Sequence, residues 1–466
     1  MTQLFALHSA YGLATAAAAI DGGLLGERGE RLLVPFHSAR VPETSVGIVD
    51  DPALSSLRAR FDRVEDLDQL LGPLHPSSWQ PDPADLPLLR RLLTRAWNLD
   101  DDLEVLLQSP QVAPAHTLML VFPHARLSVI GDGLMTYSPM RIPLPHTVTA
   151  RIGRVLHADV VPGVVPLVGS PHAETIPVPP ALFGAVLSEV ADAVPETAEV
   201  DQGTAADSAD AADGASHLDA DPSTVLVLGQ YLSALGLVSE TEEVTLQAAM
   251  IDRAAAYGPH RIVFKPHPSA PPLVTDALRD RARSHGVGFC EYRGGLSAEM
   301  LAQRLDARAV IAGFSTALPT VRAVFGREID AVGADTVLAR LTPYENSNRV
   351  PATIVDALTR ADSRYRDPER MQLLIDAVGY AMQPRVARHL RPRAEKLLAE
   401  LSAADRSRYF SADRLAELRL PGAPTESIVR RVLRPAGGVG RAEELRLTAQ
   451  GARRRLGRAW RAIRGR

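Results

Sequence analysis

One segment of unusual composition divides the sequence into two halves. Residues 189–222 contain ten acidic residues, no lysine or arginine, and no Phe, Trp or Tyr. A segment of this composition cannot bury enough apolar surface to offset the entropy lost on ordering. It therefore predicts a solvated linker between two domains. At 466 residues the chain is long enough for two or three domains.

In both halves, short apolar runs alternate with stretches in which apolar residues recur at the spacing of a helix. Strands are expected at 4–7, 31–35, 45–49, 103–107, 127–130, 154–160 and 163–168, and after the linker at 224–228, 261–264, 288–292 and 309–312. Helices are expected after the first strand, at 83–98, and from the capping-box pair Ser239 and Glu242. This alternation predicts an α/β protein with two Rossmann-like parallel sheets.

The strand at 261–264 runs into the sequence Lys265-Pro-His-Pro268. Each proline fixes its own φ and biases the preceding residue towards extended backbone, so His267 is held on a stiff stalk. Open α/β sheets bind ligands at the carboxyl ends of their strands. Lys265 is notable because the chain has only one other lysine, Lys396. A proline-rich turn with a solvent-facing histidine is the alternative interpretation.

Two further strand ends of the second half carry polar side chains. Gln230 follows the strand at 224–228, and Ser315 and Thr316 stand between the strand at 309–312 and a helix. Hydroxyls at a helix N-terminus, together with its free N–H groups, form an anion site. The simpler alternative is that Ser315 only caps the helix. Because three strand ends converge, we expect a phosphodiester or a phosphorylated nucleotide to bind here.

In the first half, Asp132 lies between two glycines directly after the strand at 127–130. An aspartate in this setting often lies in a tight turn, because glycine readily adopts positive φ and aspartate tolerates it. The position is nevertheless another strand's carboxyl end, so Asp132 is also a candidate site residue.

Other function classes are disfavoured by the sequence. It has no Gly-x-Gly-x-x-Gly fingerprint and no Walker loop, and no histidine, cysteine or carboxylate pattern suggests a metal site. A net charge of -4 argues against a general nucleic-acid binder. The single cysteine, Cys290, excludes an internal disulfide and fits a reducing compartment. With no signal peptide and no apolar run of membrane-spanning length, a cytoplasmic location is expected.

The three motifs together resemble those of a known family. Asp132-Gly133, Lys265-Pro-His-Pro268 and Ser315-Thr316, in this order, are similar to motifs of bacterial sialyltransferases, closest to the α-2,8-polysialyltransferase-like group. The resemblance runs from the first strand to about residue 360. It implies a GT-B fold with two Rossmann-like domains facing a central cleft, a CMP-sugar donor, inversion at the anomeric carbon, and no metal or cofactor.

The resemblance also implies roles for individual residues. Asp132 resembles the general base and His267 the acid that contacts the donor phosphate. Ser315 and Thr316 resemble the phosphate binders, and Glu299 the acidic residue near the cytidine ribose. The other expected donor-site residues are Lys265, Pro268 and Gln230. One departure stands out, because many relatives have two acidic residues before the glycine and this chain has Gly131 before Asp132.

The end of the chain is strongly basic. Residues 427–466 contain twelve arginines and two glutamates, and the helix expected from residue 441 places Trp460 on an apolar stripe. Nucleic acid is a competing partner, but an apolar stripe opposite arginines favours an anionic membrane surface. No nucleic-acid partner is therefore expected.

These observations give one domain plan and one expected function. The expected parts are an acceptor domain (1–185), an acidic disordered linker (186–222), a CMP-sugar-binding domain (223–360), C-terminal helices (361–420) and a basic amphipathic tail (421–466). The expected activity is transfer of a sialic acid or related keto sugar acid to a cell-surface glycan or glycolipid. The alternatives are a GT-B transferase or epimerase using a UDP-sugar or CDP-glycerol, and a GT-B protein that binds a nucleotide or glycan without catalysis.

Overall fold

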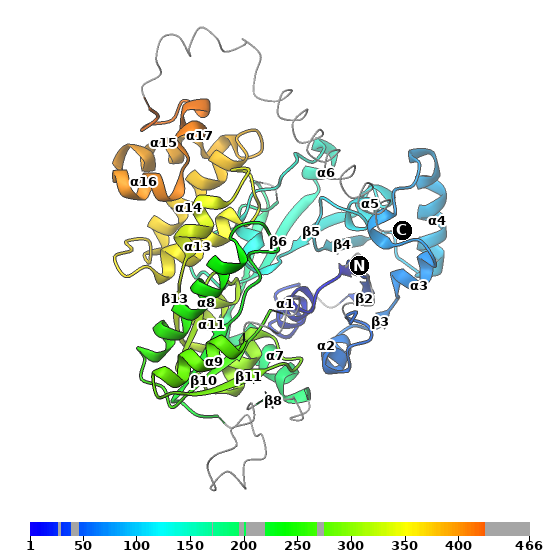
Figure 1. Cartoon of the computed structure of the whole chain (residues 1–466). Coiled ribbons are helices and arrows are strands. Elements are labelled where there is room, and N and C mark those ends of the chain that lie inside the picture. Colours follow the sequence, from blue (N-terminus) through cyan, green and yellow to red (C-terminus); the bar gives the residue numbers. More distant parts are fainter. Residues whose placement is uncertain are drawn as a thin grey trace, which may run out of the picture. The chain divides into compact units, whose positions relative to one another are not determined.

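The computed structural model describes residues 1–26, 29–38, 46–169, 171–194, 200–201, 220–267 and 275–424. The first half forms a parallel sheet of seven strands in the order β3-β2-β1-β4-β5-β6-β7 (Figure 1). Its strands are β1 (Thr2–Leu7), β2 (Glu30–Pro35), β3 (Arg63–Val64), β4 (Leu103–Leu107), β5 (Arg126–Ile130), β6 (Ile152–Ala158) and β7 (Glu174–Val178). The order reverses between β1 and β4, which is the switch point of a Rossmann sheet.

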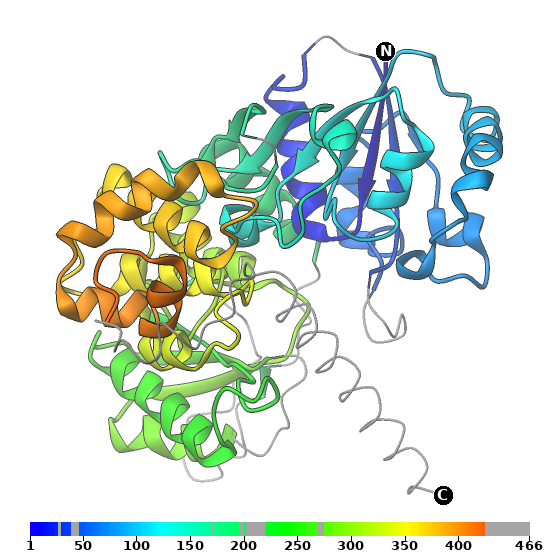
Figure 2. The ribbon, with the colours of Figure 1, turned by 90° about the horizontal axis from the view of Figure 1, so that it is seen from above.

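The second half repeats this topology. Its sheet has the order β13-β12-β9-β10-β11-β8, in which β8 is antiparallel to β11 and the other pairs are parallel. The strands are β8 (Val200–Asp201), β9 (Thr224–Leu228), β10 (Arg261–Lys265), β11 (Gly288–Tyr292), β12 (Ala309–Ala312) and β13 (Glu328–Ala331). The switch point here lies between β9 and β12. Two Rossmann-like sheets, as the sequence predicts, are confirmed, and Figure 2 shows them as separate sheets, the first mainly blue to cyan and the second green.

Helices connect the strands and cover both sheets. In the first half they are α1 (Ala10–Asp21), α2 (Ser55–Arg58), α3 (Leu67–Leu71), α4 (Leu86–Ala96), α5 (Ala115–Val121), α6 (His146–Thr149) and α7 (Pro180–Ala193). In the second they are α8 (Glu240–Ala255), α9 (Thr275–Ser284), α10 (Ala298–Arg304), α11 (Ala317–Phe325), α12 (Ala334–Arg340) and α13 (Arg349–Thr359). The helices α14 (Pro368–Met382), α15 (Arg391–Glu400), α16 (Ala403–Tyr409) and α17 (Ala412–Leu418) follow.

Local sequence signals explain where two key helices begin. Ser9 caps α1, because its side chain accepts a hydrogen bond from the backbone N–H of Gly12. The predicted capping box of α8 is confirmed: Ser239 accepts from the Glu242 N–H, and the Glu242 carboxylate accepts from the Ser239 N–H. Strands β1, β4 and β9 are buried along their whole length, as in sheets covered on both faces.

Two predicted strands of the first half are wrong. Of the run at 45–49, the described residues form a turn, in which the backbone N–H groups of Asp50 and Asp51 donate to the Gly47 carbonyl. The Arg58 guanidinium also binds the Ile48 carbonyl, so that group is not available to a strand. The described part of the run at 163–168 is turn and coil, and the edge strand β7 follows it instead. A short apolar run cannot by itself distinguish a strand from a packed loop.

The first residues of the expected linker are helical. Helix α7 continues to Ala193, and Glu189 lies within it. Both oxygens of the Glu189 carboxylate accept hydrogen bonds from Arg60, at 2.7 and 2.6 Å. This ion pair holds the pKa of Glu189 down at about 2. Residues 195–199 and 202–219 of the segment, and the predicted tail helix from residue 441, lie outside the described residues.

The two halves pack together within one unit, Met1–Gly422. Arg304 of α10 donates to the carbonyl of Ala191 at the end of α7 over 2.6 Å. Helix α14 reaches back to the first half, because the Gln372 side-chain amide accepts from the Val165 N–H and donates to the Val165 carbonyl. The sequence left open whether the helices after residue 361 cross back, and these contacts answer that question. In the described part of the chain, no helix combines the length and apolarity that a membrane span requires.

Candidate functional site

Asp132 lies at the carboxyl end of β5 and is held on two sides. Its backbone N–H donates to the Thr136 hydroxyl over 2.7 Å. Its Oδ1 atom accepts a hydrogen bond from Nε2 of Gln108 over 3.1 Å. Gly133 follows with φ of 52°, so the chain turns sharply into a 3-10 helix at Gly133–Tyr137. The carboxylate is thus fixed in position while it remains half-exposed.

Gln108 is a site residue that the sequence reasoning missed. It directly follows β4 and is fully buried. Besides Asp132, its Nε2 atom donates to the Ser9 hydroxyl over 2.7 Å, and its Oε1 atom accepts from the His8 N–H over 3.1 Å. Every polar atom of the amide therefore has a partner. A Cβ atom at Gly12 would lie 2.5 Å from Oε1, so this glycine leaves space for the amide.

His8, at the carboxyl end of β1, belongs to the same group. Its Nε2 atom is 3.0 Å from the Ser109 hydroxyl, and its ring packs on Phe36. Burial lowers the pKa of His8, and the negative charge of Asp132 opposes this effect. The ends of β1, β4 and β5 thus bring a histidine, an amide and a carboxylate together in the first half.

Position 131 is a glycine here, whereas many relatives have an acidic residue before the aspartate, and the difference has a steric reason. A Cβ atom at this position would lie 2.7 Å from the Thr136 hydroxyl oxygen and 2.9 Å from the Cβ atom of His157. His157 is buried, and burial lowers its pKa to about 4. In this chain an aspartate at position 131 has no room.

Tyr11 connects the candidate residues of the two halves. It lies in α1, its hydroxyl is buried, and its ring packs on Phe183 of α7 with centroids 5.0 Å apart. Burial raises the pKa of Tyr11, and the negative charges of Glu299 and Asp132 raise it further. Because both carboxylates act on one hydroxyl, Asp132 from the first half and Glu299 from the second lie in one neighbourhood.

The second half adds a lysine to this neighbourhood. Glu299 lies in the first turn of α10. Burial lowers the pKa of Lys265, and the negative charge of Glu299 raises it in part. The Lys265 ammonium group also lies 5.2 Å from the ring centre of Tyr292. The structure therefore brings Asp132, Tyr11, Glu299 and Lys265 into one electrostatic group.

Gln230, Ser315 and Thr316 lie at the adjoining strand ends. Oε1 of Gln230 accepts from the Phe314 N–H over 2.6 Å, so this side chain ties the end of β9 to the loop before α11. The Ser315 hydroxyl accepts from the Ala317 N–H over 3.3 Å, which is a capping role. Thr316 is exposed and its side chain makes no capping bond.

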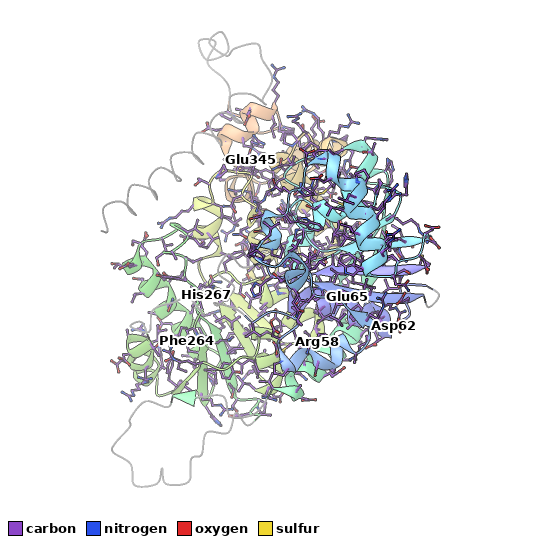
Figure 3. All side chains as sticks on the ribbon, turned by 90° about the vertical axis from the view of Figure 1, so that its right-hand side faces the viewer. Arg58, Asp62, Glu65, Phe264, His267 and Glu345 are labelled. Carbon is purple, nitrogen blue, oxygen red and sulfur yellow. The ribbon has the colours of Figure 1, made fainter. Side chains whose placement is uncertain are left out.

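His267 is exposed two residues beyond the end of β10 (Figure 3). This places it at the carboxyl end of the second sheet, where the sequence predicts it. Pro268 lies outside the described residues.

A pocket of ≈ 380 Å³ opens beside Asp132. One wall comes from the segment after β4, and the other from the chain after Asp132, including Met135, Met140 and Arg141. Ser347 of the second half closes it, since its hydroxyl accepts from Arg141 and its carbonyl from the Ser138 hydroxyl. The pocket is mainly apolar, with the carboxylate and the guanidinium as its charged groups.

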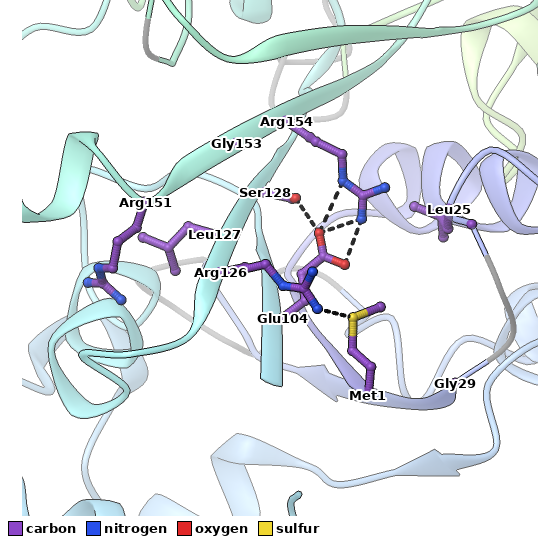
Figure 4. Close-up of a pocket in the computed structure, with 11 residues that line it drawn as sticks. Met1, Leu25, Gly29, Glu104, Arg126, Leu127, Ser128, Arg151, Gly153 and Arg154 are labelled. Atoms are coloured by element: carbon purple, nitrogen blue, oxygen red, sulfur yellow. Dashed lines mark hydrogen bonds and ion pairs between the residues drawn. The ribbon is translucent and has the colours of Figure 1, made fainter. Parts of the chain in front are cut away.

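A larger pocket of ≈ 540 Å³ lies at the opposite, amino-terminal ends of β4, β5 and β6 (Figure 4). Its charged groups are already paired. The buried Glu104 carboxylate accepts from Ser128 and Arg154, and on its other side from Gln3. Arg151 donates to three backbone carbonyls. These contacts hold neighbouring strands together. The candidate site residues lie at the opposite, carboxyl-terminal ends of the strands.

The described residues contain no cluster of three or more His, Cys, Asp or Glu side chains arranged for a metal ion.

Two Rossmann-like sheets in one chain, with polar groups gathered at the carboxyl ends of both, give the GT-B architecture that the sequence predicts. A model of the family described as Alpha-2,8-polysialyltransferase (POLYST) matches residues 3–328. The chain belongs to this family. No curated protein matches the sequence.

Solved structures share only a remote likeness. The O-GlcNAc transferase of Thermobaculum terrenum, a mutant form, is 14% identical with a TM-score of 0.35; the match covers 85% of this chain and 63% of that one. The UDP-GlcNAc 2-epimerase of Neisseria meningitidis, bound to UDP-GlcNAc, is 10% identical with a TM-score of 0.40, covering 84% and 94% of the two chains. Such distant matches transfer neither a substrate nor an activity to this chain.

Proposed function

We propose that this protein is an inverting, metal-independent glycosyltransferase that moves a sialic acid, or a related keto sugar acid, from a CMP-sugar to a cell-surface glycan or glycolipid. The proposal rests on membership of the polysialyltransferase family and on the groups that meet around Tyr11. Needing neither a metal nor a cofactor is part of the proposal.

Asp132 acts on the acceptor. An acceptor hydroxyl in the ≈ 380 Å³ pocket gives its proton to the free carboxylate oxygen, while its oxygen forms a bond to the anomeric carbon of the donor. Gln108 holds the other oxygen, Oδ1. Attack from the face opposite the leaving group inverts the anomeric carbon.

The second half acts on the donor. The bond from the anomeric carbon to the phosphate oxygen breaks, and its electron pair leaves with CMP. His267 and Lys265 stabilise the negative charge that develops on the phosphate, and Ser315 and Thr316 bind its oxygens at the start of α11. Glu299 accepts hydrogen bonds from the ribose, and the Gln230 and Pro268 segments shape the nucleotide site.

One observation carries the proposal. The pocket beside Asp132 is lined by the first half and closed by Ser347 of the second half, whose hydroxyl accepts a hydrogen bond from Arg141. The carboxylates of Asp132 and Glu299 also come from different halves, and both raise the pKa of the buried hydroxyl of Tyr11. A transferase of this class needs its acceptor base and its donor site at the same place. A protein that only binds a nucleotide has no need of that alignment.

The test combines binding and turnover. A thermal-shift screen should find that CMP compounds stabilise the protein and that UDP compounds and CDP-glycerol do not. Asp132→Asn should retain CMP binding and lose turnover by at least about 10²-fold, as expected for the loss of a positioned base. Stabilisation by UDP alone, or normal transfer by Asp132→Asn, contradicts the proposed chemistry.

A cytoplasmic location and attachment to anionic membrane through the basic tail are the remaining parts of the proposal. Each arginine near an anionic surface adds about 1 kcal/mol to binding, and an apolar stripe adds insertion. Removing residues 427–466 should reduce flotation with anionic vesicles while sparing turnover of a soluble acceptor. Equal flotation of the truncated chain contradicts this role for the tail.

A further inference from the structure

Helix α4 exposes two leucines on the outside of the first half. Leu88 is 58% exposed and Leu92 is 53% exposed. They lie one turn apart, whereas Leu89 and Leu93 of the same helix pack into the core. Figures 1 and 2 both show α4 on the outer side of the first half. The leucine pair is therefore an apolar patch that no described residue covers.

Arginines flank this patch. At roughly 100° per residue around the helix, Arg95 and Arg91 come next to the leucines, whereas Arg90 lies on the opposite side of the helix. Within the described residues, none of these three guanidinium groups has a hydrogen bond or an ion pair. Other arginines of this half do have partners: Arg60, Arg63, Arg126, Arg151 and Arg154. The charge beside the leucines is thus available to an external anion.

The arginines also line a small pocket of ≈ 290 Å³. It lies between α4 and the turn before β5, which supplies His124, and the loop before β4 supplies Asp100 and Asp101. Asp100 accepts a hydrogen bond from Thr2. Three arginines against two aspartates leave the pocket net positive.

We infer that this face of α4 docks on an anionic phospholipid surface. Leu88 and Leu92 insert at the level of the upper acyl chains, and Arg91 and Arg95 bind headgroup phosphates. A second copy of the chain fits less well, because the facing arginines would repel each other. A nucleic acid would use the arginines but would leave the leucines in water. The docking site is separate from the basic tail and from the proposed chemistry.

The test uses the full chain with a reporter at the patch. A Leu88→Cys variant in a Cys290→Ala background carries an environment-sensitive fluorophore, and Leu235→Cys is the matched control. Leu235 is 64% exposed and lies in the second half. Vesicles of phosphatidylglycerol and phosphatidylcholine should shift the emission at position 88 to the blue and leave position 235 unchanged. Pure phosphatidylcholine should shift neither.

Unlabelled variants provide a second measurement. Leu88→Ser/Leu92→Ser and Arg91→Gln/Arg95→Gln should each weaken partition into the anionic vesicles by roughly tenfold, and Leu235→Ser should not. Flotation with silent fluorescence at position 88 would place membrane binding elsewhere on the chain and overturn the inference. So would the absence of flotation, or an arginine variant that loses RNA binding but not vesicle binding.

Discussion

The side chain of Gln108 donates a hydrogen bond to Oδ1 of Asp132 over 3.1 Å, although the two residues end different strands. The amide has no polar atom to spare, because it also binds Ser9 and the backbone of His8. In the proposed mechanism Asp132 is the acceptor base, which must be aimed at its substrate, and this contact fixes its orientation.

Replacing Gln108 should therefore lower turnover without changing donor affinity. Gln108→Met keeps the volume but removes the hydrogen bonds, and we expect kcat to fall by roughly tenfold to hundredfold. The Kd for CMP should stay within about twofold, because Gln108 does not face the donor half. Gln108→Glu is the matched variant of nearly equal shape, and it should fail as well, since it offers no donor to Asp132. An equal loss of CMP affinity in both variants would point to general unfolding.

His267→Ala should affect both binding and rate. Because the imidazole is proposed to contact the donor phosphate, its loss should weaken CMP binding and also slow transfer, by about 10²-fold. His260 is the control: it is exposed at the amino-terminal end of the same strand, β10. His260→Ala should change neither quantity. If His267→Ala transfers at the normal rate, the histidine is only a surface residue of a stiff turn.

His157 should make the fold sensitive to mild acid. Burial lowers its pKa from 6.5 to about 4, so the unfolded chain binds a proton more readily than the folded one. The free energy of unfolding is therefore unaffected by this group above pH 6.5. It falls by about 3 kcal/mol in total as the pH is lowered from 6.5 through 4. His157→Gln should therefore show a smaller fall in Tm between pH 7 and pH 4 than the unmodified protein. Parallel curves would exclude this role.

Two parts of the acidic segment should affect the stability of the fold differently: residues 202–219 should contribute little, and Glu189 should contribute through its ion pair. Replacing residues 202–219 with a Gly/Ser linker should leave Tm nearly unchanged, because their composition offers nothing to a core. Glu189→Gln should lower stability by up to about 1 kcal/mol, because it breaks a partly exposed pair with Arg60. That loss should shrink as the pH falls from 4.5 through 2, and it should vanish only below pH 2, where Glu189 is protonated in both states. A large loss from replacing 202–219 would mean that this part is built into the fold.

Glu104 should be a large contributor to stability. It is 3% exposed and binds Arg154, Ser128 and Gln3. Glu104→Leu therefore leaves Arg154 and Ser128 without this partner, while Gln3 keeps its hydrogen bond to the Leu25 carbonyl. We expect a loss of about 3 kcal/mol in urea unfolding. Asp102→Asn is the control, since Asp102 and Arg126 form an ion pair that is mostly exposed. That change should cost less than about 1 kcal/mol.

The sheets were predictable because their strands are buried on both faces and read as continuous apolar runs. The same rule misread the runs at 45–49 and 163–168, where loops are packed by contacts from distant residues. It also missed β7, whose exposed edge position lets Glu174 and Pro177 stand in the strand.

The site was predictable where a polar residue follows a strand and stands out in the sequence. Asp132 is flanked by glycines and His267 by prolines, and both residue types mark turns and the ends of strands in a sequence. Gln108 has the same signal as Gln230, a polar residue directly after an apolar strand, and the rule could have found it. Tyr11 has no such signal, because its neighbours Asp132 and Glu299 are brought to it only by folding.

The crowding at Gly131 makes three positions dependent on one another. A Cβ atom there would meet Thr136 and the Cβ atom of His157, so a second acidic residue requires a smaller side chain at 136 together with a glycine or a shifted backbone at 157. Homologues with two acidic residues before the glycine should therefore differ at these positions as well. Sequence covariation among 131, 136 and 157 would then separate the family into two groups, one of which places an additional negative charge beside its acceptor.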